Sequence, residues 1–157
     1  MFVYTLKAST IKFFGVVLLS VVVLIALVAA IPDYNTGEVA AVAINYDDIK
    51  TNENRVEFLE SFGYTIKTEP SEVVEVVIPD EFNSIYETYN NIQKSQGLNL
   101  KKYQGKKITR YTYEVENYGY DGRVLANLLI YKNKVIGGDV CSLDGEGFIH
   151  GFENPQK

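Results

Sequence analysis

The chain contains one cysteine, one histidine and no tryptophan among its 157 residues. A single cysteine excludes an internal disulfide, so an exported domain in this chain must be held together by its own core. Because that cysteine is Cys141, lipid attachment to a cysteine behind an N-terminal apolar segment is excluded as well. One cysteine and one histidine do not supply the ligand spacing of a zinc site, and we expect neither a metal nor a cofactor.

Basic residues are also in short supply, with 15 Lys and Arg against 20 Asp and Glu and a formal net charge of −5. This balance argues against a nucleic-acid partner and against adhesion to anionic lipid by charge. The composition, 46% hydrophobic and 22% charged, is that of a folded chain. The length leaves room for one ordinary domain and a terminal extension.

A long apolar run lies near the amino terminus. Residues 13–31, FFGVVLLSVVVLIALVAAI, carry no charge and would form about 29 Å of helix, close to the hydrocarbon thickness of a bilayer. Lys7 and Lys12 precede the run, and the next basic residue is Lys50. This bias predicts a single-pass signal anchor in the cell membrane, with a cytoplasmic N-terminus and an extracytoplasmic C-terminal domain. The alternative is a chain that is secreted after cleavage near Ala30.

The apolar run divides the chain into four predicted parts. We predict a cytoplasmic N-terminus over residues 1–12, a transmembrane helix over 13–31, a linker over 32–51 and an extracytoplasmic domain over 52–154. The linker prediction rests on residues 33–50, where turn residues, a moderately apolar stretch and polar residues follow one another. No internal repeat and no low-complexity tract divides the sequence of the domain further.

Two amphipathic helices are predicted in the domain. The first runs from Asn52 to Gly63, with early acidic residues and apolar residues at helical spacing, and it ends at the glycine. The second lies between Ile78 and Gly97, where Asp80 is placed to cap the first free amides. We expect its apolar stripe to be buried against a sheet. The stripe consists of Phe82, Ile85, Tyr89 and Ile92.

The remaining segments are predicted to form strands. Residues 72–78 are rich in β-branched side chains, and residues 108–117 alternate between apolar and polar ones, which predicts two strands. Residues 124–131 and 135–142 follow across short turns, and a short strand over 148–152 ends the domain. This order predicts an α+β domain, with two helices packed on one face of a four- to five-stranded, mostly antiparallel sheet that is a meander in its C-terminal half.

From Asn54 onward the chain resembles a bacterial family known as domain of unknown function 4830. The resemblance is carried by NRVEFLESFGYTI (54–66), VVIPDEF (76–82), YNNIQKSQGLNLKKYQGKKITRYTYEV (89–115), ANLLIYKNKVIGGDV (126–140) and GFIHGF (147–152). It implies a membrane-tethered, extracytoplasmic domain of unknown role. It implies no catalytic residues, because the family is itself uncharacterised.

Cys141 and His150 are the first candidates for chemistry. They could become neighbours if the last two strands form a hairpin, but a nucleophilic pair needs hydrogen-bonding reach between the two side chains. A packed and inert thiol is the simpler interpretation of Cys141. Gly137 and Gly138 lack the helix, lysine and hydroxyl of a phosphate-binding loop, and they predict a β-bulge instead.

Tyrosines form the second group of candidates. Aromatic rings with polar tips suit carbohydrate or peptide ligands, and they equally suit the rim of a small core. The candidate ligand-binding residues are Tyr111, Tyr113, Tyr118, Tyr120 and His150.

The sequence favours a membrane-anchored, extracytoplasmic binding or interaction domain without catalytic machinery. Its partners would be the membrane, through the N-terminal helix, and a protein, peptide or cell-wall ligand. One alternative is a small cell-envelope hydrolase that uses Cys141 and His150, which requires the two side chains within reach of each other and open to solvent. The other is a structural adaptor subunit of a membrane complex, which predicts an exposed apolar patch on the sheet face away from the helices.

Overall fold

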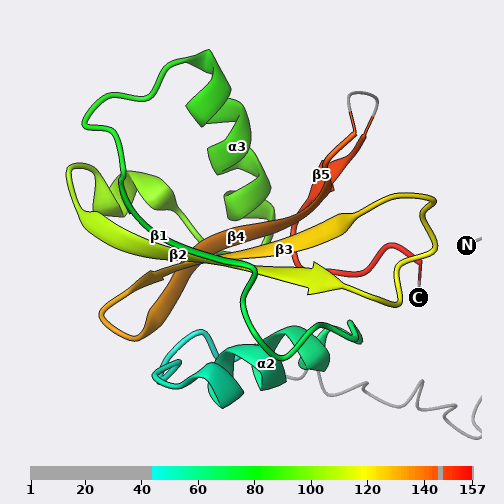
Figure 1. The fold of residues 1–157 in the computed structure, drawn as a ribbon. Helices are drawn as coiled ribbons and strands as arrows, with labels where there is room; N and C mark the ends of the chain where they lie inside the picture. The colour runs from blue at the N-terminus through cyan, green and yellow to red at the C-terminus, as the bar shows by residue number, and fades with distance from the viewer. Residues whose placement is uncertain (1–43, 145–146, 157) are drawn as a thin grey trace, which may run out of the picture. The chain divides into compact units, whose positions relative to one another are not determined.

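The computed structural model describes residues 44–144 and 147–156. In chain order its elements are α2 (Asn52–Ser61), β1 (Glu72–Val77), α3 (Ser84–Ser95), the 3-10 helix η1 (Leu100–Tyr103), β2 (Lys107–Val115), β3 (Val124–Tyr131), β4 (Lys134–Ser142) and β5 (Ile149–His150). The five strands pair in the order β1-β2-β3-β4-β5, and each neighbouring pair is antiparallel (Figure 1). This confirms the α+β class and extends the predicted meander over the whole sheet.

The sheet carries one helix on each face (Figure 1). Ile108 of β2 and Leu129 of β3 belong to the core on the α3 side. Tyr113 and Leu128 of the same two strands belong to the core on the α2 side, together with Leu59 of α2. The prediction that both helices share one face is therefore wrong. Because β2 and β3 present apolar side chains alternately to both faces, each face needs a cover.

α2 begins at a capping box and is joined to β2 by a buried arginine. The Thr51 side chain accepts from the Asn54 N–H, and the Asn54 side chain accepts in return from the Thr51 N–H. Arg55 is only 9% exposed, although it is charged. Its guanidinium carbon lies 3.9 Å from the centroid of the Tyr111 ring, and its Nε donates to the Tyr113 hydroxyl at 2.9 Å. These contacts let a charged side chain lie in the core.

α3 begins later than predicted. It starts at Ser84 and is capped by Asn83, whose side-chain oxygen accepts from the Tyr86 N–H at 2.9 Å. Asp80 lies in the preceding loop and does not cap the helix, because Asn83 offers an equally strong cap closer to the regular turns. Phe82 therefore leaves the predicted helical stripe, and it packs against the core on the α3 side from the loop.

α3 docks on the sheet with polar side chains. Asn90 and Gln93 are fully buried, whereas Ile85 of the predicted stripe is 76% exposed. Gln93 Oε1 accepts from the Gly138 N–H of β4 at 2.8 Å, and the amide nitrogen of Gln96 donates to the Gly138 carbonyl at 3.0 Å. The prediction that the apolar stripe is buried against the sheet is wrong at Ile85. Amide side chains occupy this face of the helix because they form hydrogen bonds with backbone groups of β4 that are not paired with another strand.

β4 contains the bulge predicted for its two glycines. The register between β3 and β4 shifts where Ile136 precedes Gly137 and Gly138. A Cβ at Gly138 would lie 2.3 Å from the Asn127 carbonyl oxygen and 2.3 Å from Cζ of Phe152. Only glycine fits at this point. A Cβ at Gly137 would lie 3.1 Å from Gln93 Oε1, so the neighbouring glycine leaves room for the α3 amide.

The compact unit that holds these elements begins at Asn45. Ile49 is buried, and its N–H donates to the Asn133 carbonyl at 2.8 Å, so the last residues of the segment 32–51 contribute to the fold. Among the residues that the structure describes, no helix is long and apolar enough to cross a membrane. The predicted transmembrane helix over residues 13–31 lies outside the described residues.

Candidate functional site

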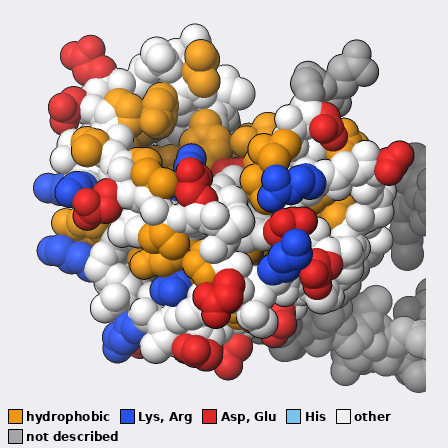
Figure 2. Space-filling view, in the orientation of Figure 1, with side chains coloured by type: hydrophobic (Ala, Val, Ile, Leu, Met, Phe, Trp, Pro, Cys, Tyr) orange, Lys and Arg blue, Asp and Glu red, His pale blue; other side chains and the backbone are white. Residues whose placement is uncertain are grey.

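A groove lies between α3 and the sheet face beneath it. Its volume is about 410 Å³, and ligand-binding clefts measure about 300 to 1,000 Å³. Figure 2 shows the hollow between α3 and β5, with hydrophobic side chains gathered on its walls. Every strand of the sheet contributes a lining residue. The lining includes Val76, Ile78, Ile85, Tyr86, Tyr89, Leu100, Arg110, Asn127, Leu129, Asp139, Cys141 and Ile149.

The walls of the groove include the apolar stripe of α3. Ile85 is 76% exposed at the mouth, and Ile149 of β5 is 50% exposed. A second hollow of about 380 Å³ shares Ile85, Tyr89 and Ile149 with the first and reaches Ile92. Three members of the predicted stripe therefore line these two hollows.

Hydrogen bonds link the polar side chains of the groove floor across three strands. Thr112 of β2, Asn127 of β3 and Asp139 of β4 are register neighbours and share one face. Thr112 Oγ1 donates to Asn127 Oδ1 at 2.8 Å, and Asn127 Nδ2 donates to Asp139 Oδ2 at 2.9 Å. From α3, the Tyr89 hydroxyl donates to Asp139 Oδ1 at 2.7 Å. Asp139 is 4% exposed, and both of its oxygens have donors, as a buried carboxylate requires.

Tyr89 stays a donor because of where it lies. Burial first, and then the neighbouring Asp139 carboxylate, hold the pKa of the Tyr89 hydroxyl well above its ordinary value. The hydroxyl therefore keeps its proton even at alkaline pH, where an exposed tyrosine would ionise. This bond joins the middle of α3 to the floor of the groove.

Arg110 brings a cation to the β1 side of the floor. Its Nη2 pairs with the Glu72 carboxylate of β1. Its Nε is buried and has no hydrogen-bond partner among the described residues. A buried N–H without an acceptor is costly, and an acceptor supplied by a ligand in the groove would satisfy it.

Cys141 and His150 do not form a nucleophilic pair. Cys141 is the register partner of Ile149, and His150 occupies the next position along β5. Successive side chains of a strand point to opposite faces, so Cys141 lines the groove and His150 lies on the other face. His150 Nε2 is 2.9 Å from the Tyr118 hydroxyl, and its Nδ1 is 2.6 Å from the Gly151 carbonyl. The structure therefore gives no support to a hydrolase that uses this pair.

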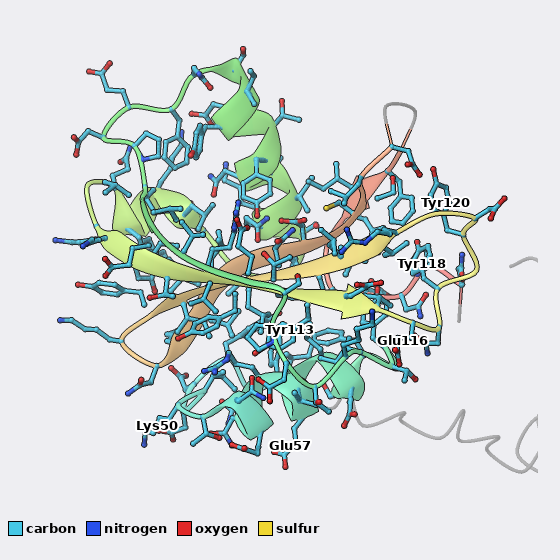
Figure 3. All side chains as sticks on the ribbon, in the orientation of Figure 1. Lys50, Glu57, Tyr113, Glu116, Tyr118 and Tyr120 are labelled. Atoms are coloured by element: carbon cyan, nitrogen blue, oxygen red, sulfur yellow. The ribbon has the colours of Figure 1, made fainter. Side chains whose placement is uncertain are left out.

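Three of the candidate ligand-binding residues come together, and Figure 3 shows two of them, Tyr118 and Tyr120, near the β2–β3 loop. Tyr118, Tyr120 and His150 surround Phe148, with ring centroids 4.8 Å, 5.3 Å and 5.3 Å from that of Phe148. Tyr118, Tyr120 and Phe148 also pack against the core on the α2 side. Their placement suits the rim of a core, and ligand binding by this group stays a prediction.

The other two candidates lie apart from that group, beside α2. Tyr113 is fully buried, and its hydroxyl donates to Asn52 Oδ1 at 2.8 Å while accepting from Arg55 (Figure 3). Tyr111 lies under the Arg55 guanidinium. Burial raises the pKa of the Tyr113 hydroxyl, and the Arg55 bond opposes the shift. Both rings are engaged in holding α2 to β2.

The polar residues of the groove floor are not among the candidates that the sequence indicates. Arg110, Asn127 and Asp139 lie far apart in the sequence, and only the strand register brings them together. One signal was available, since Asn127 and Asp139 interrupt strands that are otherwise apolar. Within residues 44–144 and 147–156, no group of three or more His, Cys, Asp or Glu side chains is placed to hold a metal ion.

Comparison with known families identifies the domain. The family model described as Domain of unknown function (DUF4830) matches residues 58–140, more than half of the chain. The chain belongs to this family. The match confirms the resemblance and includes α3 and the strands that form the floor of the groove. Neither the curated proteins nor the solved structures give a match.

We expect Cys141 of this DUF4830 domain to resist alkylation. Burial first, and then the Asp139 carboxylate, raise the pKa of its thiol to about 12. Because only the thiolate reacts, the rate with iodoacetamide should climb steadily with pH up to that value, and it should stay at least about tenfold below the rate for the urea-unfolded chain at neutral pH. Mass spectrometry of the labelled protein measures both rates.

A Lys132→Cys variant supplies the control, because Lys132 is exposed and lies in the tight turn between β3 and β4. Its added cysteine should react at the rate of the unfolded chain. Labelling of Cys141 as fast as that exposed cysteine at neutral pH would contradict the packed-thiol interpretation.

Proposed function

We propose that the chain is a non-enzymatic binding domain, held at the outer face of the cell membrane by its N-terminal helix. We propose that the groove beneath α3 takes an apolar segment of a peptide or protein partner. The observation that carries the proposal is that the helix docks on β4 through Gln93 and Gln96 and leaves Ile85 exposed over the groove. A helix face that the fold does not bury is available to a partner.

The charges around the groove favour a neutral ligand. The floor and its β1 rim hold one cation, Arg110, and two carboxylates, those of Glu72 and Asp139. An acidic ligand would meet two like charges beside a single guanidinium that is already paired. A peptide with aliphatic side chains avoids this repulsion, and its backbone carbonyls are acceptors for Arg110.

The two alternative functions have less support. Cys141 and His150 face opposite sides of the sheet, which removes the nucleophilic pair that the hydrolase requires. The adaptor subunit predicts an apolar sheet face away from the helices, and each face of this sheet carries a helix (Figure 1). Neither alternative explains the apolar groove that the described residues form.

The membrane part of the proposal is supported by the sequence. Residues 13–31 are apolar and long enough to span a bilayer, and Lys7 and Lys12 precede them. The positive-inside bias favours an orientation in which the DUF4830 domain lies outside the cell. A binding domain in that position would meet peptides and proteins of the cell envelope.

The groove can be tested with random peptides displayed on phage, selected on the full chain in lipid nanodiscs. Selected peptides should be rich in aliphatic residues. Ile85→Asp puts a carboxylate on the exposed wall, and it should weaken the binding of these peptides about tenfold or more, since a buried aliphatic contact contributes about 1.5–3 kcal/mol. Biolayer interferometry with the wild-type chain and the variant measures the change.

Leu143→Asp is the matched control, because Leu143 is 58% exposed and does not line the groove. It should leave peptide affinity unchanged. The groove is the wrong site if Leu143→Asp weakens binding as much as Ile85→Asp. The proposal fails outright if no peptide is enriched over empty nanodiscs.

The orientation in the membrane is tested by labelling intact cells with a membrane-impermeant maleimide. In a Cys141→Ala background, Lys132→Cys should be labelled in intact cells and Lys7→Cys only after lysis. Labelling is read on the purified protein by mass spectrometry. Labelling of Lys7→Cys in intact cells would reverse the orientation, and recovery of the domain from the medium would favour secretion after cleavage.

A further inference from the structure

The outer edge of β1 has no partner strand among the described residues. β1 is the first strand in the order of five and pairs only with β2. Next to it, the Ile78 N–H donates to the Lys106 carbonyl at 3.0 Å. Residues that bond across an antiparallel pair alternate with residues that do not. The N–H and C=O groups of Val73, Glu75 and Val77 therefore point away from the sheet.

This edge lacks the usual protection against pairing. Exposed edge strands are normally protected from pairing with another strand by a proline, a β-bulge or a lysine. β1 has the sequence EVVEVV and pairs with β2 over all six residues without a register shift. Val73 is 52% exposed and Val77 is 58% exposed. The edge is regular, apolar and open.

The acidic residues of β1 do not close the edge either. Glu75 pairs with Lys107 of β2 at 2.6 Å, and Glu72 pairs with Arg110 of β2. Each carboxylate is thus directed back toward the sheet by a cation on the neighbouring strand. An incoming strand meets partly neutralised charges at this edge.

The open edge borders the groove. Val76 and Ile78 line the groove from the β1 side. Val76 is the register partner of Ile108, which belongs to the core on the α3 side. A strand added outside β1 would place every second side chain on that same face. Backbone pairing and groove binding are therefore open to one extended peptide at the same time.

We infer that the partner binds by strand addition. An extended peptide pairs with the outer edge of β1 as a sixth strand, and its alternate aliphatic side chains enter the groove beside Val76 and Ile85. This inference rests on the proposed function and adds the form in which the partner is held. In such complexes the backbone bonds supply affinity and the pocket supplies specificity. The partner is then an extended, uncharged segment with aliphatic residues at alternate positions.

Hydrogen exchange followed by mass spectrometry gives the structural test. The full chain in nanodiscs is compared with and without a peptide selected on it by phage display. Exchange should slow at Val73, Glu75 and Val77, whose N–H groups acquire acceptors. Unchanged exchange over β1 in a saturated complex would overturn strand addition.

Glu75→Pro gives the functional test, with Glu75→Ala as its matched control. Both variants lose the ion pair with Lys107, but only proline removes the outward N–H, and proline is tolerated at an edge where that N–H faces away from the sheet. Glu75→Pro should weaken binding of the selected peptides about tenfold or more, and Glu75→Ala should leave it within about twofold of the wild type. Thermal unfolding verifies that both variants fold.

The outcomes separate this inference from the proposed function. Equal affinities for Glu75→Pro and Glu75→Ala overturn strand addition. If Ile85→Asp still weakens binding in that case, the proposed binding in the groove is retained and only strand addition is rejected. A dimer of the peptide-free chain that Glu75→Pro dissociates also overturns the inference, because the edge then serves a second copy. If no peptide is enriched, the proposed function fails and the inference fails with it.

Discussion

The arrangement of this domain depends on two glutamine side chains, one in α3 and one at its C-terminal cap, that bind one residue of β4. Gln93 accepts from the N–H of Gly138, and Gln96 donates to its carbonyl. β5 pairs only with Val140 and Cys141, so these backbone groups would otherwise be buried without partners. The bond from Tyr89 to Asp139 then fixes the rotation of the helix about its axis. With those bonds made, the apolar stripe of α3 faces the groove.

This docking is a costly way to attach a helix. A satisfied buried hydrogen bond contributes about 1 kcal/mol, whereas burial of an isoleucine side chain contributes about 1.5–3 kcal/mol. Because Ile85 is 76% exposed, the domain gains little of the stabilisation that burial of this side chain would give. Departures of this kind from the most stable packing are expected at functional sites. The groove and its buried polar floor lie on this side of the sheet, and the open edge of β1 borders the groove.

The sequence predicted the elements more successfully than their docking. Alternating apolar residues predict β2, and the turn at Lys132 and Asn133, where both residues have positive φ, separates β3 from β4 as predicted. Apolar periodicity failed for α3 because it counts only apolar residues. Amide side chains also recur at helical spacing, at Asn90, Gln93 and Gln96. The sequence pattern does not distinguish a stripe of amides that is exposed to water from one that binds unpaired backbone groups.

The groove floor could not be predicted for a related reason. Asn127 and Asp139 are recognisable as polar residues in apolar strands, but their contact depends on the register between β3 and β4. A bulge in β4 shifts that register, and a shift of one residue would turn Asp139 to the other face. Arg110 lies on β2 in an alternating strand, where a polar side chain is expected on an exposed face.

The most direct test of the account compares urea unfolding of two variants of the full chain in nanodiscs, followed by tyrosine fluorescence. Gln93→Leu leaves the Gly138 N–H without its acceptor and should lower the free energy of unfolding by about 1–3 kcal/mol, while Ile85→Ser should change it by less than about 0.5 kcal/mol. The reverse result, a stable Gln93→Leu and a destabilised Ile85→Ser, would show that the apolar stripe is part of the core and would contradict the account.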